Sequence, residues 1–189
     1  MTQEAETTFG MLLDVVAAGN VLVLSGAGLS TESGIPDYRG PTGLARGATP
    51  MTYQTFTGSA AARRRYWARS HLGWRHIAQA VPNDGHRAVA ELGRCGRLAG
   101  IITQNVDGLH QAAGASEVIE LHGSLHRVIC LSCGQRTARA DLHRRLAVAN
   151  PDWDAESTAL INPDGDAVLA DDATESFRVA GCTVCHGVL

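Results

Sequence analysis

The sequence contains no lysine, since all 16 of its Lys and Arg positions are arginine. Chemistry directed at a lysine amine would therefore find no target within this stretch. The sequence also has no apolar run near the roughly 18 residues that a membrane span requires. Residues 1–10 include two glutamates and no basic residue, whereas secretory and mitochondrial presequences need positive charge. We therefore expect a cytoplasmic location and no membrane partner.

Positive charge is not gathered into a broad surface. The net charge is −3, and the one tight group of basic residues is Arg63, Arg64 and Arg65. Direct nucleic-acid binding is therefore not expected. With 44% hydrophobic and 19% charged residues in 189 positions, the composition is that of a globular chain long enough for one domain or for a domain with a small satellite.

Cysteines are few, but four of the five form two C-x-x-C pairs, Cys130 with Cys133 and Cys182 with Cys185. Without a secretion signal, this pattern indicates metal binding rather than disulfides; reduced cysteines without metal are the alternative. Four thiolates suit one tetrahedral Zn²⁺ per chain and leave no position for water, so the zinc should be structural. Cys95 is expected to be a small buried thiol on a helix.

Hydrophobic periodicity predicts an α/β chain. Apolar residues at helical spacing predict a helix over about residues 9–16, ended by Gly19, and further helices around residues 66–77 and 88–92. The continuous apolar run at 21–24 predicts a parallel strand buried on both faces. Two more strands are predicted at 98–103 and 118–121, each followed by polar residues, as at the carboxyl edge of an α/β sheet.

Two segments depart from this alternation. Residues 40–58 are rich in Gly, Pro and Thr and are expected to form a long loop. From Cys130 onward the composition shifts toward turns and acidic residues, as in Asn162-Pro-Asp-Gly-Asp166. The predicted organisation is a nucleotide-binding domain over residues 1–125 and a zinc module over 126–189.

Three motifs carry the chemistry. Gly26-Ala27-Gly28 follows the first strand and suits a loop that approaches a pyrophosphate, although alone it is also typical of a tight turn. Its continuation to Arg39 resembles the first signature of the sirtuins, with Tyr38 in place of Phe. Thr103-Gln-Asn-Val-Asp-Gly-Leu-His110 and Glu120-Leu-His-Gly123 resemble two further sirtuin motifs, in the same order.

The resemblance covers nearly the whole chain and is closest to the class II group of mitochondrial sirtuin 4. Residues 34–39, 65–69 and 162–166 are similar to that group's pattern, as are the 48 residues between the two cysteine pairs. The resemblance implies a Rossmann-like NAD-binding sheet with a small zinc module. Sirtuins continue beyond the second cysteine pair into the rest of that sheet, so we expect this sheet and its adenosine site to be incomplete in this chain.

The resemblance implies that NAD and acyl-lysine proteins are the reactants. The site must exclude water from the ribose carbon C1′ while nicotinamide leaves. A base titrating near neutral pH must then activate a ribose hydroxyl, and His122 fits that role. The implied catalytic residues are His122, Asn105 and Asp107. The implied NAD-binding residues are Gly26, Ala27, Gly28, Ser30, Ile35, Pro36, Asp37, Tyr38, Arg39, Gln104, Asn105, Asp107 and His122.

Tyr66-x-x-Arg69 resembles a Tyr/Arg pair with which some sirtuins receive acidic acyl groups, because a guanidinium can pair with a carboxylate. An ordinary amphipathic helix is the alternative reading.

The predicted function is NAD-dependent protein lysine deacylation, which releases nicotinamide and O-acyl-ADP-ribose. Two alternatives remain open at the level of the sequence. Protein mono-ADP-ribosylation shares the first chemistry at C1′ and differs in the acceptor. A non-catalytic module that binds zinc and nucleotide would follow if the chain were complete at 189 residues.

Overall fold

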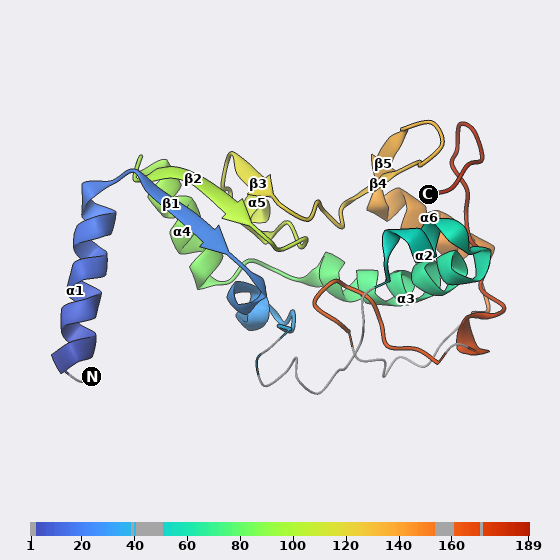
Figure 1. Ribbon diagram of the computed structural model, residues 1–189, viewed down its shortest axis with the longest axis horizontal. Helices are drawn as coiled ribbons and strands as arrows, with labels where there is room; N and C mark the ends of the chain where they lie inside the picture. The colour runs from blue at the N-terminus through green and yellow to red at the C-terminus, as the bar shows by residue number, and fades with distance from the viewer. Residues whose placement is uncertain (1–2, 39, 41–50, 154–160, 171) are drawn as a thin grey trace.

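The computed structural model describes residues 3–38, 40, 51–153, 161–170 and 172–189. Along the chain these residues form helices, strands and two 3₁₀ segments (Figure 1). Their bounds are α1 Gln3–Ala18, β1 Val21–Ser25, η1 Ala27–Ser33, α2 Tyr53–Gly58, α3 Ala60–Gln79, α4 Asp84–Arg94, β2 Leu98–Thr103, α5 Leu109–Ala112, β3 Val118–Glu120, β4 Arg127–Ile129, β5 Arg136–Ala138, α6 Arg139–Ala149 and η2 Asp172–Thr174.

The predicted parallel sheet is confirmed. Its three strands lie in the order β1-β2-β3, and β2 pairs in parallel with both neighbours. The register aligns Val23, Ile101 and Val118 in one row and Leu24, Ile102 and Ile119 in the next. Because side chains alternate across a strand, these two rows point to opposite faces of the sheet.

The prediction that the first strand is buried on both faces is wrong for this chain. Ile101 is 3% exposed, whereas Leu24 is 66% exposed and Ile119 57%. Helix α4 packs on β2, and the described residues leave the Leu24 face uncovered. An apolar run therefore shows that a strand can be buried on both faces. Whether each face is buried depends on the other elements that pack against it.

Helix α1 is longer than the predicted segment and ends where Gly19 was expected to end it. Gly19 has φ +78°, the left-handed conformation that glycine adopts without strain. Its N–H donates to the carbonyl of Val16 at 3.1 Å. The helix lies at one end of the molecule beyond β1 (Figure 1), and Phe9 and Leu12 on it are exposed.

The predicted loop over 40–58 is wrong at its C-terminal end, where α2 begins at Tyr53. Thr52 caps this helix, because its hydroxyl accepts from the N–H of Thr55 at 3.2 Å. Ser59 then caps α3 in the same way, accepting from Ala62 at 3.2 Å. The composition of this stretch predicts a loop, whereas its Thr52 and Ser59 serve as helix caps. Residues 41–50 lie outside the described part.

Helix α3 belongs to two hydrophobic cores. In its first half, Trp67 and Ala68 pack with residues of α6, with Leu189 and with one cysteine of each pair, Cys130 and Cys182. Near its end, Trp74 and Ile77 pack with Ile35, which follows η1, and with Leu109 of α5. Figure 1 shows α3 running from near the carboxyl ends of β1 and β2 to the end of the molecule that holds α2, α6, β4 and β5. The boundary predicted at 125/126 stays a prediction, and α3 packs on both sides of it.

The C-terminal end is more ordered than its composition suggested. Strands β4 and β5 form an antiparallel pair, and the 11-residue helix α6, which the sequence did not lead us to expect, follows directly. Leu142 and Leu146 of α6 are 1% and 0% exposed, so its apolar positions anchor this core. None of the helices among the described residues is long and apolar enough to cross a membrane.

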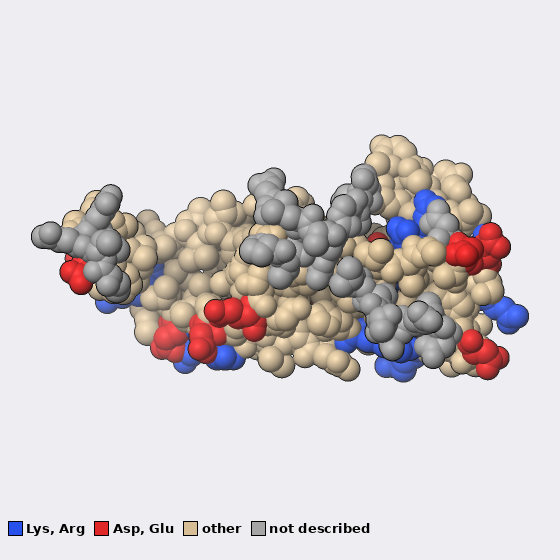
Figure 2. All heavy atoms as spheres, turned by 90° about the horizontal axis from the view of Figure 1, so that it is seen from below, with Lys and Arg blue, Asp and Glu red and all other residues tan. Residues whose placement is uncertain are grey.

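Two surface features complete the fold. Cys95 was expected to be buried, but it caps the C-terminus of α4, is exposed and donates to Glu91 Oε1 at 3.3 Å. On the face shown in Figure 2, the charged side chains of the described residues form small groups of both signs among larger uncharged areas.

Candidate active site

Polar side chains converge at the carboxyl edge of the parallel sheet. Ser30 of η1 is fully buried and donates its hydroxyl proton to Asp107 Oδ2 at 2.7 Å. The other carboxylate oxygen of Asp107 accepts from the N–H of Leu109 at 2.9 Å, which fixes the start of α5. Both oxygens of Asp107 are thus held in place before any ligand binds.

Asn105 is held by the same network. Its Nδ2 donates to Ser30 Oγ and to the carbonyl of Gly26, each at 3.1 Å. Its backbone N–H donates to Thr103 Oγ1 at 3.1 Å. Because both hydrogen bonds of the amide nitrogen are made within the protein, the orientation of the Asn105 side chain is fixed. Its side-chain oxygen can accept a hydrogen bond from a ligand.

A second layer of buried groups lies behind this network. The Ser25 hydroxyl donates to Thr103 Oγ1 at 2.9 Å, so the 2.8 Å contact between Ser25 and His110 makes His110 Nε2 the donor. His126 donates from Nε2 to the carbonyl of Asp107 at 2.7 Å. Both histidine rings therefore hold groups of the protein in place, His110 the strand-end hydroxyl of Ser25 and His126 the carbonyl of Asp107.

His122 follows β3 and lines a cavity of about 560 Å³ at this edge. Its ring is on an exposed segment, whereas Asn105 and Asp107 in the same wall are 9% and 6% exposed. The cavity is lined by Ala27, Ser30, Ile35, Tyr38, Met51, Tyr66, Gln104, Asn105, Val106, Asp107, His122, Leu125, Pro163, Asp164 and Asp166. The fold therefore brings together most of the residues that the sequence predicted for one site.

Other predicted residues lie beside the cavity without lining it. They are Gly26, Gly28, Pro36 and Asp37, while Arg39 falls outside the described residues. A Cβ at Gly26 or Gly28 would meet no atom within 4 Å, and neither glycine has a positive φ. Neither packing nor backbone strain therefore requires glycine at these two positions. Close approach of a ligand to the backbone would require it, because a side chain would stand in the way.

Sequence reasoning missed two carboxyl groups in the cavity wall, those of Asp164 and Asp166. Burial, with the nearby Asp164 carboxylate adding to it, raises the pKa of Asp166 to about 8. Burial also raises the pKa of Asp164. In the sequence these carboxyl groups stand in a turn-rich stretch around Pro163. Its composition predicts turns, but it does not show that the chain returns there to the edge of the sheet.

Of the pair predicted to receive acidic acyl groups, Tyr66 lines the cavity of His122 and Arg69 does not. Tyr66 lines the cavity beside His122 and also a second cavity of about 390 Å³. Burial raises the pKa of Tyr66 to about 12, so its phenol is protonated at neutral pH. Arg69 lines neither cavity and donates from Nη2 to the carbonyl of Leu169 at 3.2 Å. The role of the pair stays a prediction.

The four paired cysteines converge beside the hydrophobic core that contains Trp67 of α3. Their Sγ atoms all lie within 4.8 Å of one another, with Cys130 and Cys185 at 3.5 Å and Cys133 and Cys182 at 3.7 Å. A tetrahedral zinc with Zn–S bonds near 2.3 Å would place its sulfurs about 3.8 Å apart. The donor set and its spacing therefore fit structural zinc.

Backbone groups prepare this site for thiolates. The N–H of Ser132 points at Cys130 Sγ and the N–H of Val184 at Cys182 Sγ, each at 3.4 Å. Such donors favour the charged form, and the N–H of Cys185 together with that of Val184 lowers the pKa of the Cys182 thiol. Each C-x-x-C turn thus forms a knuckle that supplies both sulfurs and hydrogen bonds to them.

The family description "Sir2 family" matches residues 26–189, which include the sheet edge, the cavity and the cysteine site. The chain belongs to the Sir2 family. It is 61% identical over 183 residues to NAD-dependent protein deacetylase 1 of Streptomyces coelicolor, covering 97% of this chain and 61% of that protein. It is also 46% identical over 178 residues to bovine mitochondrial NAD-dependent protein lipoamidase sirtuin-4, covering 93% of this chain and 56% of that protein.

Solved Sir2 structures share the fold. A Sir2 complex with p53 peptide and NAD⁺ superposes with a TM-score of 0.61 at 31% identity, covering 84% of this chain and 60% of that one. An ADP-ribose complex of a Sir2 homologue gives 0.58 at 40% identity, covering 73% and 53%. The chain spans about 60% of the length of the Streptomyces coelicolor deacetylase.

Proposed function

We propose that this chain forms the nicotinamide side and zinc module of an NAD-dependent protein lysine deacylase. The convergence of Asn105, Asp107 and His122 on one cavity carries the proposal. The names of the relatives support it, because the Streptomyces protein is an NAD-dependent protein deacetylase and one related structure holds both NAD⁺ and a p53 peptide. The reaction consumes NAD, acyl-lysine and water and yields lysine, nicotinamide and O-acyl-ADP-ribose.

Bound NAD supplies the electrophile, its ribose carbon C1′. Asn105 and Asp107 bind the nicotinamide carboxamide, because a fixed amide oxygen and carboxylate edge can accept its two N–H groups. Ile35 is 2% exposed and closes the apolar side of this wall. With the carboxamide fixed and water excluded, the acyl oxygen rather than water forms the new bond to C1′ as the bond to nicotinamide breaks.

His122 is proposed as the general base. It follows β3 and lines the same cavity as Ser30 and Asp107, which are held by their own hydrogen bond. An imidazole can take a proton from a ribose hydroxyl at neutral pH and return it later in the cycle. Gln104 lines the same wall and is proposed to contact the ribose, while Gly26 and Gly28 admit the phosphates.

Incubation with an acetyl-lysine peptide and NAD tests this function. The wild-type protein should release nicotinamide and deacetylated peptide in equal amounts, and His122→Ala should lower the rate by about 10²- to 10⁴-fold, the usual contribution of a general base. Substitution of His186, which lies by the cysteine site, serves as the matched histidine control and should leave the rate within about twofold. An unaltered peptide with the wild-type protein and NAD would sink the proposal.

The same incubation with labelled NAD separates deacylation from mono-ADP-ribosylation. Label on released O-acyl-ADP-ribose supports deacylation, and label retained on protein after denaturing washes supports transfer. Acyl-lysine proteins are the proposed partners. The cytoplasmic location stays a prediction from the first ten residues.

A further inference from the structure

The segment that follows the proposed base runs beside the loop that carries Asp107. The N–H of Leu125 donates to the carbonyl of Val106 at 2.9 Å, and the ring of His126 donates from Nε2 to the carbonyl of Asp107 at 2.7 Å. These two bonds join residues 122–126 to residues 105–107. The base and the carboxylate of the site therefore lie on two segments that are bonded directly to each other.

All three oxygens of Asp107 accept hydrogen bonds from the protein. Oδ2 accepts from the hydroxyl of Ser30 at 2.7 Å, and Oδ1 accepts from the N–H of Leu109 at 2.9 Å. These two bonds fix the carboxylate, whereas the bond from His126 fixes the backbone to which the carboxylate is attached. The orientation of the Asp107 side chain thus depends on His126 as well as on Ser30.

The ring of His126 is held in place although the residue is exposed. Its edge packs on Trp74, with the ring centroids 5.3 Å apart and the planes at 76°. The ring also lies against the backbone of Gly108, where an added Cβ would come within 2.9 Å of both Cδ2 and Nε2. Burial does not account for an aromatic ring at this exposed position, whereas the placement of Nε2 at the Asp107 carbonyl does.

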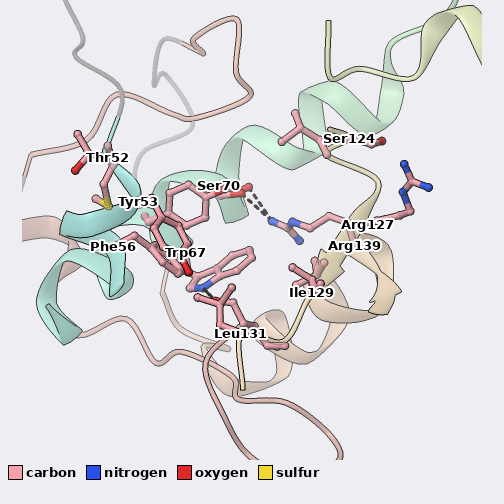
Figure 3. A pocket seen from close by; sticks show the side chains of 15 residues that line it. Thr52, Tyr53, Phe56, Trp67, Ser70, Ser124, Arg127, Ile129, Leu131 and Arg139 are labelled. Atoms are coloured by element: carbon pink, nitrogen blue, oxygen red, sulfur yellow. Dashed lines mark hydrogen bonds between the residues drawn. The ribbon is translucent and has the colours of Figure 1, made fainter. Parts of the chain in front are cut away.

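The start of α6 supports the same arrangement. The N–H of Arg139 donates to the carbonyl of His126 at 2.9 Å, and its guanidinium lies 5.1 Å from the ring centroid of Trp74. Figure 3 shows this guanidinium in the second cavity, directed at Ser70, whose carbonyl and hydroxyl oxygens accept from Nη2 at 3.0 and 3.3 Å. Arg139 therefore fixes both the backbone of His126 and the ring against which the imidazole packs.

His126 differs in its place from His122. His122 lines the cavity of the sheet edge, and among the described residues His126 is not part of that cavity's wall. Its ring nitrogen contacts the protein backbone behind the wall instead. A role in the reaction would therefore be exerted through Asp107 and not by contact with the reactants.

We propose that His126 is a positioning residue for the nicotinamide site, which holds the carbonyl of Asp107 and thereby joins the segment of His122 to the loop that binds the carboxamide. The inference rests on the proposed deacylase function, because that function gives Asp107 its role toward nicotinamide. Loss of this one donor should weaken the binding of nicotinamide more than that of the acyl peptide.

Two amide variants that differ by one methylene group isolate the donor. In His126→Gln the side-chain nitrogen can occupy the position of the imidazole Nε2, whereas in His126→Asn it reaches only about as far as Nδ1. Both side chains are polar and suit an exposed position, so both variants should fold. His126→Phe keeps a ring beside Trp74 and lacks the donor. We expect the Gln variant to resemble the wild type and the Asn and Phe variants to share one defect.

Hydrogen exchange of the unliganded protein measures how firmly Asp107 is held. The reporter is the N–H of Leu109, which bonds to Asp107 Oδ1. His126→Asn and His126→Phe should speed the exchange of this amide roughly three- to tenfold, a factor typical of one hydrogen bond, and His126→Gln should leave it within about twofold. Arg127→Met is the matched control, because Arg127 is the next residue, is also exposed and pairs with Glu120. It should leave the exchange within about twofold.

Inhibition by nicotinamide tests the consequence for the site. With NAD and an acetyl-lysine peptide, the inhibition constant of nicotinamide should rise roughly three- to tenfold in His126→Asn and His126→Phe, while KM for the peptide stays within about twofold. A general loosening of the fold would change both constants. Wild-type values for His126→Asn in either measurement, or an equal defect in His126→Gln, would overturn the proposal. If the wild type turns over no peptide, the deacylase function fails, while the exchange of Leu109 still decides whether His126 holds Asp107.

Discussion

At the scale of single residues, the site is an arrangement of partners rather than of isolated reactive groups. Ser30 illustrates this, since its hydroxyl accepts a hydrogen bond from the Asn105 amide and donates one to Asp107. Asn105, Asp107 and His122 could be predicted because short sequence motifs carry them. Asp164 and Asp166 could not, because their place in the cavity wall depends on how distant segments pack.

Ser30→Ala should loosen this arrangement. The change leaves Asp107 Oδ2 and one Asn105 N–H without their buried partner, which should cost about 1–3 kcal/mol in the free energy of unfolding. The rate of nicotinamide release should fall as well, because both side chains lose their fixed orientation. Urea unfolding and steady-state kinetics measure the two effects. Thr31→Ala, on the same 3₁₀ segment but exposed, is the control, and equal effects of the two changes would contradict the argument.

At the scale of elements, the sequence predicted what depends on local pattern. The three parallel strands and Gly19 at the end of α1 follow from apolar runs and from backbone preference. Helices α2 and α6 were missed for different reasons. The caps of α2 resemble a loop in composition, and α6 follows a strand with no polar cap, since Ala138 at that position forms no side-chain bond.

The contact between α3 and α6 should weaken in acid. The rings of His71 and His143 stack at 4.4 Å. Burial, together with the nearby charges of Arg75 and Arg139, lowers the pKa of each to about 4. Because these values lie below that of an unfolded histidine, near 6.5, the unfolded chain takes up protons first as the pH falls. Stability should therefore be full above about pH 6.5 and decline toward pH 4.

Urea midpoints between pH 7.5 and 4.5 measure this decline. In a variant with both His71→Gln and His143→Gln, the loss over that range should be smaller by about 1 kcal/mol or more. His76→Gln, an exposed histidine of α3, is the control and should leave the slope unchanged. A double variant with the wild-type slope would show that other groups cause the acid sensitivity.

At the scale of the whole molecule, two hydrophobic cores and one metal site share a single long helix. The cysteine pairs were predicted with their ligand type because their spacing is local and specific. The sharing of α3 was not predicted, because the periodicity of a helix shows that it has a buried face and not which element covers each turn of it.

Removal of zinc should unfold the C-terminal core. Cys130 and Cys182 are each 1% exposed and pack against Trp67, so their thiolates would be left unpaired in an apolar core without the metal. A chelator, or Cys133→Ser, should lower the thermal midpoint and change Trp67 emission, and native mass spectrometry should find one zinc per folded chain. Cys95→Ser should behave like the wild type, because that thiol is exposed and outside the cluster. A metal-free chain with an unchanged midpoint would contradict the structural role.

The continuity of α3 also decides how this protein can be dissected. At 1.5 Å per residue, its 20 residues reach about 30 Å, and each end supplies side chains to a different core. A cut at 125/126 would leave Trp67 and Ala68 on one fragment and the rest of their core on the other. The core around Trp74 and Ile77 would stay whole on the first fragment, whereas the core around Trp67 would be divided between the two. A break at 125/126 therefore separates the C-terminal part from the helix that completes its hydrophobic core.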